Sequence, residues 1–207
     1  MRLSEAAPSS VAAHYAEFQR LPVAGGREVL LWASGAFMTD YFASSPVCER
    51  IGLRGRRVLE IGAGAGTLAR VLAQQGAEVT AADVEPELTL LKSETATHAQ
   101  IPVRVVELWW GAEGWRQSVL SGEEHFDFVF CADLIAFPDL HEVLLYTLGQ
   151  LIGPSTTCFF GFRNRDDFSM SFMADLHDLD QFEVAEEAAH EAEDEEILLY
   201  RITRKKK

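Results

Sequence analysis

Residues 58–68, VLEIGAGAGTL, constrain the fold of this chain more than any other stretch. An apolar run leads into three glycines at alternate positions, Gly62, Gly64 and Gly66, and a second apolar run begins after them. Glycine adopts backbone angles that are closed to other residues, and a backbone without side chains lets a ligand approach closely. The pattern therefore predicts a buried strand, a tight turn and the start of a helix, with a ligand site above the turn.

Strand-like and helix-like segments alternate after this turn, as a parallel sheet with crossover helices requires. The clearest helix is expected at residues 138–152, where apolar residues keep the spacing i, i+3, i+4, i+7. A further helix is expected around 165–179. The expected parallel strands are, in chain order, residues 57–61, 78–82, 103–108, 126–132 and 157–162.

Two last strands are expected at residues 182–185 and 197–203. The strongly acidic segment 186–196 joins them and is interpreted as a loop, so an antiparallel hairpin is expected at the sheet edge. The predicted fold is therefore α/β and Rossmann-like. It has a seven-stranded, mostly parallel sheet, an antiparallel C-terminal hairpin, and helices on both faces.

The length of the chain fits one domain, residues 1–207. Residues 1–20 are Ala- and Ser-rich and are expected to form a loosely held arm or a short helix. Residues 204–207 are expected to form a frayed basic tail.

Three local features are expected beside the sheet. Residues 21–32 predict a hairpin with its turn at 24–27. Ser34 is expected to cap the helix that follows. The polar segment 111–125 is expected to be a loop with one helical turn.

The formal net charge of −14 bounds the possible partners. It argues against nucleic acid and against an anionic membrane, and it suits a basic or lysine-bearing protein surface. No apolar run approaches the length that crosses a bilayer, so no membrane partner is expected.

The three cysteines, Cys48, Cys131 and Cys158, match neither a zinc spacing nor a redox CxxC motif. Cys131 and Cys158 lie in apolar, strand-like runs, so we interpret these two as core residues. We expect a reducing compartment and a cytoplasmic protein. The histidines also lack a ligand spacing, so no metal site is expected. We expect the chain to be a monomer.

Two carboxylates separate the possible ligand classes. Glu60 comes two residues before the first glycine, and Asp83 ends the next strand. A dinucleotide fingerprint would have its third glycine where this chain has Thr67, and an acid at position 60 would repel a pyrophosphate. Glu60 suits a ligand with a positive amino group, and Asp83 can accept both hydroxyls of a ribose. Together they favour S-adenosylmethionine over NAD.

From about residue 30 to residue 201, the chain resembles the class I, seven-β-strand methyltransferases. Within that class it is similar to the methyltransferase-like protein-lysine methyltransferases, which modify chaperones and translation factors. The segments that carry the resemblance are LWAS at 31–34, the glycine stretch at 58–68, LWWG at 108–111, FCADLIA at 130–136 and, more weakly, the strand ending at 162–163.

The resemblance implies S-adenosyl-L-methionine as the cofactor. Trp32 would touch the methionine end or cover the cofactor, and the glycine turn with Glu60 would hold the methionine and the sugar. Asp83 would bind the ribose, and Trp110 would pack near the adenine. The implied cofactor-binding residues are Trp32, Glu60, Gly62, Gly64, Gly66, Asp83, Trp110 and Ala132.

The resemblance also implies a role for Asp133, which with Ala132 would line the site of methyl delivery. We expect Asp133 to be the catalytic residue that orients the acceptor amine, without acting as a strong base. The family's motif at this point is D-x-x-Y, and this chain has Ala136 in place of the tyrosine. Phe137 could fill part of that space, but it cannot donate a hydrogen bond.

Several functions stay open at this point. The leading hypothesis is methylation of a lysine side chain in a protein. The missing tyrosine motivates a non-catalytic S-adenosylmethionine-binding or interaction module as an alternative, and a small-molecule methyltransferase is another. The acidic charge, and the absence of an N-P-P-Y-type motif after residues 126–132, argue against a nucleic-acid methyltransferase.

Overall fold

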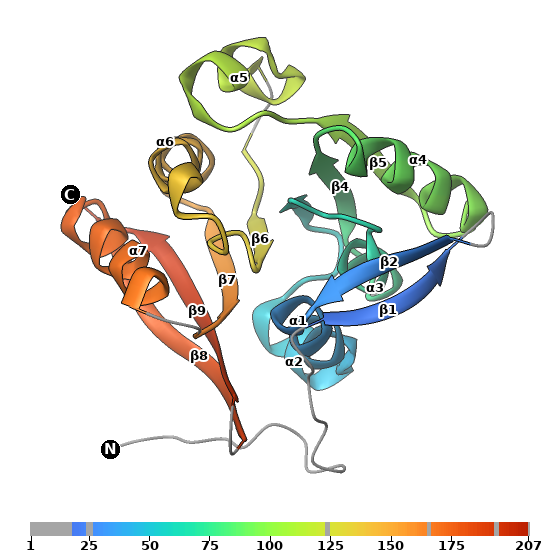
Figure 1. Ribbon diagram of the computed structural model, residues 1–207, viewed down its shortest axis with the longest axis horizontal. Helices are drawn as coiled ribbons and strands as arrows, with labels where there is room; N and C mark the ends of the chain where they lie inside the picture. Colours follow the sequence, from blue (N-terminus) through green and yellow to red (C-terminus); the bar gives the residue numbers. More distant parts are fainter. Residues whose placement is uncertain (1–17, 24–26, 123–124, 165–166, 193–194, 207) are drawn as a thin grey trace.

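The computed structural model describes residues 18–23, 27–122, 125–164, 167–192 and 195–206. Its strands form a two-stranded sheet and a seven-stranded sheet, and helices pack around the larger one (Figure 1).

The spatial order of the seven-stranded sheet confirms the predicted fold class. The first five strands in that order are parallel, and β9 is antiparallel to both of its neighbours. The chain runs outward from β3 to β4 on one side and later to β6 on the other, and this switch point is where open α/β sheets bind ligands. The order is β5 (Val103–Glu107), β4 (Glu78–Asp83), β3 (Arg57–Ile61), β6 (Phe128–Ala132), β7 (Thr157–Arg163), β9 (Glu195–Arg204) and β8 (Phe182–Ala192).

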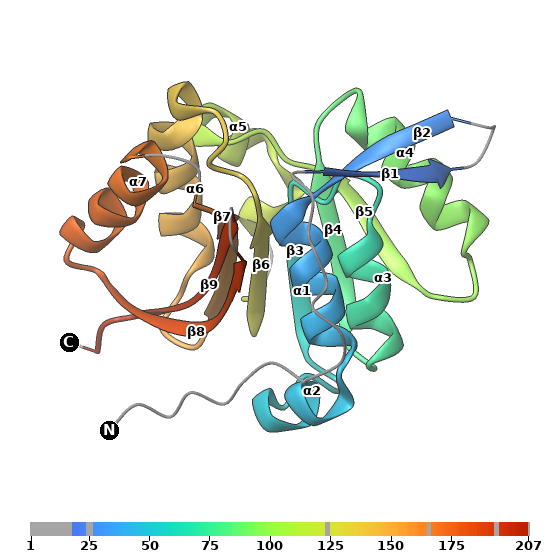
Figure 2. The same ribbon diagram turned by 60° about the horizontal axis from the view of Figure 1, so that its bottom comes forward.

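Helices cover both faces of this sheet (Figure 2). On one face, the α1-side cluster of buried apolar residues includes side chains of α1 (Ala33–Ala43), α3 (Thr67–Gln74) and α4 (Glu87–Thr97). On the other face, the α6-side cluster includes side chains of α6 (His141–Leu151) and α7 (Asp167–Asp178).

Strand β7 shows why both faces are covered. Successive side chains of a strand point to opposite faces, and β7 has a phenylalanine in each direction. Phe159 packs on Phe42 of α1 with ring centroids 5.2 Å apart, whereas Phe160 stacks on Phe172 of α7 at 5.5 Å. All four side chains are buried. A strand that is apolar on both sides needs a helix layer on each.

The N-terminal hairpin is confirmed, with β1 (Phe18–Val23) antiparallel to β2 (Arg27–Trp32). The expected boundaries change in two ways. β1 begins inside the expected arm, because it pairs with β2 along its whole length, and Arg27, expected in the turn, already belongs to β2. Residues 1–17 and 24–26, which hold the rest of the expected arm and turn, lie outside the described residues.

The expected loop at 111–125 is wrong, because much of it is helical. It contains α5 (Gly111–Gln117) and the 3-10 helix η1 (Val119–Gly122). Leu120 is buried, and Trp115 packs against the α6-side cluster. These tertiary contacts order a segment whose polar composition favours a loop.

The expected acidic loop at 186–196 is also wrong. β8 continues to Ala192 and β9 begins at Glu195, so most of that segment is paired strand. Glutamate is rare in strands, and this segment is rich in it. Other residues of the segment nevertheless pair with apolar residues of β9: Ala189 pairs with Leu198, and His190 pairs with Ile197. Pairing with the apolar β9 strand outweighs the local preference.

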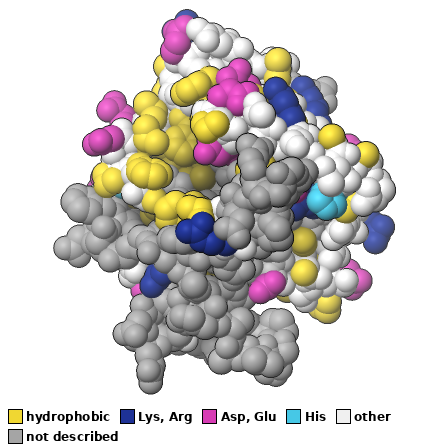
Figure 3. All heavy atoms as spheres, turned by 45° about the vertical axis from the view of Figure 1, so that its right-hand side comes forward, with side chains coloured by type: hydrophobic (Ala, Val, Ile, Leu, Met, Phe, Trp, Pro, Cys, Tyr) yellow, Lys and Arg dark blue, Asp and Glu magenta, His cyan; other side chains and the backbone are white. Residues whose placement is uncertain are grey.

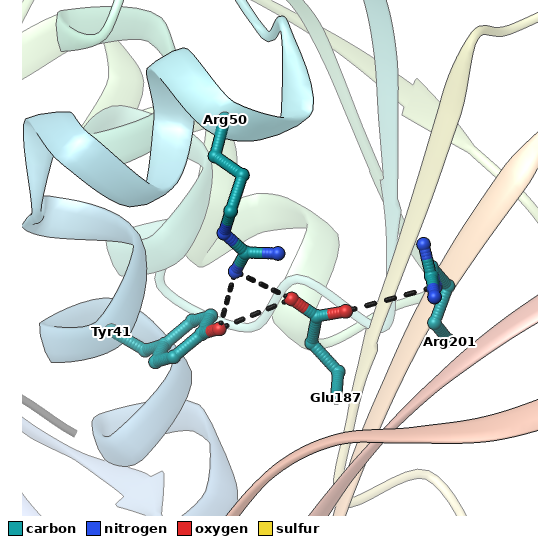
Figure 4. Close-up of polar contacts among 4 residues, drawn as sticks. All are labelled: Tyr41, Arg50, Glu187 and Arg201. Carbon is teal, nitrogen blue, oxygen red and sulfur yellow. Dashed lines mark hydrogen bonds and ion pairs between the residues drawn. The ribbon is translucent and has the colours of Figure 1, made fainter. Parts of the chain in front are cut away.

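A β-bulge in β8 directs one acidic side chain inward. The register against β9 shifts at Glu187, which has no partner there, and its side chain is 5% exposed. Its carboxylate accepts a hydrogen bond from the Tyr41 hydroxyl (3.1 Å) and forms ion pairs with Arg50 (2.7 Å) and Arg201 (3.7 Å) (Figure 4). Tyr41 belongs to α1 and Arg50 to α2 (Ser45–Ile51), so the bulge fastens the C-terminal hairpin to both helices.

The expected fraying of residues 204–207 does not extend to Arg204 and Lys205. Arg204 ends β9, and its guanidinium donates hydrogen bonds to the carbonyls of Ile152 and Gly149 at 2.7 and 2.8 Å. The backbone N–H of Lys205 donates to the Gln181 carbonyl at 2.8 Å. Residue 207 lies outside the described residues.

We expect Glu187→Ala to lower the free energy of unfolding by about 2 kcal/mol, because it leaves the buried Tyr41 hydroxyl without its acceptor. Burial, followed by the charge of Glu187, raises the pKa of Tyr41 to about 12, so this pKa should fall in the variant. Denaturant unfolding and ultraviolet titration of tyrosine measure the two effects. Glu183→Ala, which removes an exposed glutamate of the same strand, is the control and should change neither. Equal stability of the two variants would contradict the role of the bulge.

Candidate functional site

The glycine turn after β3 has the conformation that the sequence predicts. Gly62, Gly64 and Gly66 have φ angles of 65°, 54° and 69°, in the left-handed region that favours glycine. A Cβ at Gly62 would clash with Leu134, and a Cβ at Gly66 would lie 2.7 Å from Leu91. At Gly64 an added Cβ would meet no atom within 4 Å. The turn is therefore packed at Gly62 and Gly66 and open at Gly64, where a ligand can approach the backbone.

Asp83 ends β4 and holds this turn. Its Oδ2 accepts a hydrogen bond from the Gly64 N–H at 2.7 Å, and its Oδ1 accepts one from the Val84 N–H at 2.8 Å. Burial raises the pKa of Asp83, and the two N–H groups oppose that shift. Each carboxylate oxygen has a second lone pair, so the side chain can still accept ribose hydroxyls.

Glu60 lies on the same side of β3 as α3 and is 4% exposed. It accepts a hydrogen bond from the Ala69 N–H in the first turn of α3. Among the described residues, its Oε2 has no hydrogen-bond partner. Burial raises the pKa of Glu60 to about 8, the charge of Asp83 adds to the shift, and Arg70 opposes it. A buried oxygen without a partner is rare in proteins and fits a donor supplied by a ligand.

Asp133 follows β6 and connects three elements. Its φ is 55°, unusual for a residue with a side chain. Its Oδ2 accepts from the Ser34 N–H at the start of α1 (2.8 Å), and its Oδ1 accepts from the Arg163 N–H at the end of β7 (3.2 Å). Its own N–H donates to the Gly161 carbonyl at 2.9 Å. Asp133 thus fixes the start of α1 against the ends of β6 and β7, while its role toward an amine stays a prediction.

The expected cap of α1 is wrong. Ser34 lies inside the helix, and its hydroxyl donates to the Gly161 carbonyl at 3.1 Å. The carboxylate of Asp133, distant in sequence, takes the place of a local cap. Trp32 is the last residue before α1 and is half-buried, and Ala132 faces α1 near Gly35.

The LWWG segment lies beside Asp83. The Leu108 N–H donates to the Asp83 carbonyl at 3.1 Å. Trp110 is half-buried and packs against the α6-side cluster, whereas Trp109 is 54% exposed. The Gly111 N–H donates to a threonine hydroxyl of α6 at 2.9 Å, which fixes the end of the segment. The structure therefore brings Trp110 to the same edge of the sheet as Asp83.

The position of the missing tyrosine is small and partly covered. Ala136 is half-buried, and Phe137 is 60% exposed, so Phe137 points largely to solvent. Leu140, one turn later, is 41% exposed. Figure 3 shows a face on which hydrophobic side chains gather with acidic side chains beside them.

Two residues of the site were missed from the sequence. Arg70 donates to the Ala65 carbonyl of the glycine turn at 2.7 Å, and Glu94 of α4 is buried at 4% exposure. The sequence feature that could have indicated Arg70 is its position within the apolar stripe formed by Leu68, Val71 and Leu72. The described residues hold no group of three or more side chains that could bind a metal ion. None of the described helices is long and apolar enough to span a bilayer.

A family model described as lysine methyltransferase matches residues 23–179, well over half of the chain. The chain belongs to this family. EEF1A lysine methyltransferase 3 of Xenopus tropicalis is 28% identical over 177 residues, which cover 84% of this chain and 74% of that protein. Protein N-lysine methyltransferase METTL21A of Danio rerio is 31% identical over 163 residues, or 76% and 70% of the two chains.

A solved structure of a different methyltransferase shares the fold of this family member. Magnesium protoporphyrin IX methyltransferase (ChlM) from Synechocystis PCC 6803, solved with bound SAH, superposes with a TM-score of 0.58 at 16% identity, covering 83% of this chain and 85% of that one. The likeness shows that the two proteins share a fold.

Alanine substitutions at two glycines of the turn should distinguish the cost of a side-chain clash from the cost of backbone strain alone. Gly62→Ala should cost about 3 kcal/mol of stability, because its Cβ clashes with Leu134 in a strained backbone. Gly64→Ala should cost about 1 kcal/mol, from backbone strain alone. Denaturant unfolding of both variants tests this order, and a larger loss in Gly64→Ala would contradict it.

Glu60 should make stability depend on pH. The folded chain holds the Glu60 proton up to about pH 8, whereas the unfolded chain releases it near the ordinary value of 4.5. The stability of the natural protein should therefore fall relative to Glu60→Gln as pH rises from about 5 to 8, by at most ~1.4 kcal/mol per pH unit. Unfolding free energies of both proteins across this range measure the difference.

The matched control is Glu78→Gln, at an exposed position in β4. Its stability should run parallel to that of the natural protein. If the stability of Glu60→Gln also runs parallel to that of the natural protein, burial does not raise the pKa of Glu60.

Proposed function

We propose that this family member is an S-adenosylmethionine-dependent protein-lysine methyltransferase with its cofactor site above the glycine turn. The main observation in support of this proposal is the buried Glu60 carboxylate, whose Oε2 lacks a hydrogen-bond partner among the described residues. It lies beside the turn that is open at Gly64. An ammonium group is a donor of the right charge for that oxygen, and S-adenosylmethionine carries one.

The neighbouring residues fit the rest of this cofactor. Asp83 has free lone pairs for the ribose hydroxyls, and its hydrogen bond to the Gly64 N–H keeps the turn in place for the sugar. Trp110 lies at the same sheet edge and offers an aromatic surface for the adenine. Trp32 ends β2 at the start of α1, where we propose that it covers the methionine end.

The bound cofactor would supply a methyl group on a positively charged sulfonium. The chain must present the acceptor as a neutral amine, whereas free lysine has a pKa of about 10.4. Desolvation at the strand ends lowers that pKa. Asp133 is buried with two backbone N–H groups on its carboxylate, so its position is fixed, and we propose that this carboxylate orients the amine. Rate acceleration then comes mainly from positioning.

We propose a basic, lysine-bearing protein as the acceptor. The net charge of −14 favours association with a positively charged surface. The names of the two relatives, a lysine methyltransferase of EEF1A and a protein N-lysine methyltransferase, support a protein substrate.

One observation favours a second candidate function. Ala136 stands where the resembled motif has tyrosine, and the adjacent Phe137 is mostly exposed. Neither side chain can donate a hydrogen bond to an acceptor amine. A protein that binds the cofactor without transferring its methyl group would have these features.

Titration calorimetry with S-adenosylmethionine and transfer of a labelled methyl group to proteins of a cell extract test both candidates. We expect the natural protein to bind and to label a protein band. Asp83→Asn and Glu60→Gln should each weaken binding about tenfold, since each loses a charged acceptor. Binding without any labelled protein would support the non-catalytic candidate, and absence of binding would sink both.

A further inference from the structure

Arg70 reaches from the second turn of α3 back to the glycine turn. Its Nη1 donates to the Ala65 carbonyl at 2.7 Å, and its Nη2 lies 3.5 Å from the Thr67 hydroxyl. Nη1 also lies 3.7 Å from the place that a Cβ on Gly66 would occupy. One guanidinium therefore contacts the residues on both sides of Gly66, at the point where the turn becomes a helix.

Asp83 holds the same turn from the other side. It accepts a hydrogen bond from the Gly64 N–H at 2.7 Å, one residue before the carbonyl that Arg70 binds. The carboxylate of Asp83 thus binds the backbone N–H of Gly64, and the guanidinium of Arg70 binds the backbone carbonyl of Ala65. The turn is fixed between β4 and α3, and the space above Gly64 is left open.

Arg70 also lies in the field of two buried carboxylates. Burial lowers its pKa, and the charges of Glu94 and then Glu60 oppose that shift. Glu94 is 4% exposed and lies three residues after Leu91 in α4, so both are on the face of α4 that packs on the turn. Glu94 offsets the positive charge of Arg70, which would otherwise repel a cationic ligand at Glu60.

We propose that Arg70 is a positioning residue of the cofactor site, which fixes the glycine turn from the α3 side and sets a positive charge near Glu60. This inference rests on the proposed function. The other titratable groups that act on or near Glu60 are Asp83 of β4 and Cys131 of β6, while the Ala69 N–H of α3 donates to it. Arg70 is the cation among these groups.

The test compares three variants of the full chain. Arg70→Met keeps the length of the side chain and removes its charge, and Arg70→Lys keeps the charge and removes the planar fork. Arg54→Met is the matched control, since Arg54 is exposed and packs against Gly76 beyond the far end of α3. The dissociation constant for S-adenosylmethionine is measured by calorimetry between pH 6.5 and 9.

Arg70→Met should weaken binding about tenfold at pH 7, and the loss should narrow toward pH 9, where Glu60 ionises without help. Arg70→Lys should bind more weakly than the natural protein with an unchanged pH profile, and Arg54→Met should match the natural protein. Any titration of S-adenosylmethionine itself in this pH range affects the natural protein and the variants alike, so it does not alter the comparison between them. Natural affinity in Arg70→Met, or a loss that is equal at every pH, would overturn the inference.

A measurement without S-adenosylmethionine tests the role of Arg70 independently of the proposed function. The pH at which Glu60 ionises follows from the stability of a protein relative to its Glu60→Gln counterpart. This midpoint should rise when Arg70→Met is present in both, because the charge of Arg70 opposes the upward shift of the Glu60 pKa. A natural protein that binds no S-adenosylmethionine would defeat the proposed function, and an unmoved midpoint would defeat the role of Arg70.

Discussion

The site depends on hydrogen bonds from backbone N–H groups to three buried or half-buried carboxylates at the ends of adjacent parallel strands. Asp83 ends β4 and holds the glycine turn. Glu60 lies near the end of β3 and accepts from the start of α3, and Asp133 follows β6 and accepts from the start of α1. The first N–H groups of a helix have no partners inside the helix, and the helix dipole favours a negative charge there. Asp133 and Glu60 each accept from such an N–H group, whereas Asp83 accepts from the glycine turn. Each of the three carboxylates fixes the element that it contacts.

The three carboxylates differ in what they leave available. Asp83 and Asp133 have a backbone partner on each oxygen, so both are firmly placed before any ligand arrives. Glu60 keeps one buried oxygen unpaired within the described residues, and its pKa is raised to about 8. Leaving such a group unsatisfied costs stability, and a ligand cation removes that cost. This difference is why we propose that the ammonium group of the cofactor binds at Glu60.

The outer elements of the sheet are tied to this centre by contacts that are distant in sequence. The bulge at Glu187 links the C-terminal hairpin to α1 and α2, and the same helix α1 is held at its other end by Asp133. Trp32, at the start of α1, is thereby placed relative to β6 and β7. At Ala136 and the exposed Phe137, where the resembled motif has its tyrosine, neither side chain has a hydrogen-bonding group.

The sequence by itself determined the strand, the glycine turn and the helix start at 58–68, the order of strand and helix segments, and the identity of the acids at strand ends. These follow from local periodicity and from backbone angles that only glycine adopts readily. Only the tertiary structure decided that the acidic segment 186–196 is mostly strand, that Asp133 caps α1, and that Arg70 holds the turn. Each of these depends on a partner many residues away or on a side-chain direction, and no local pattern encodes either one.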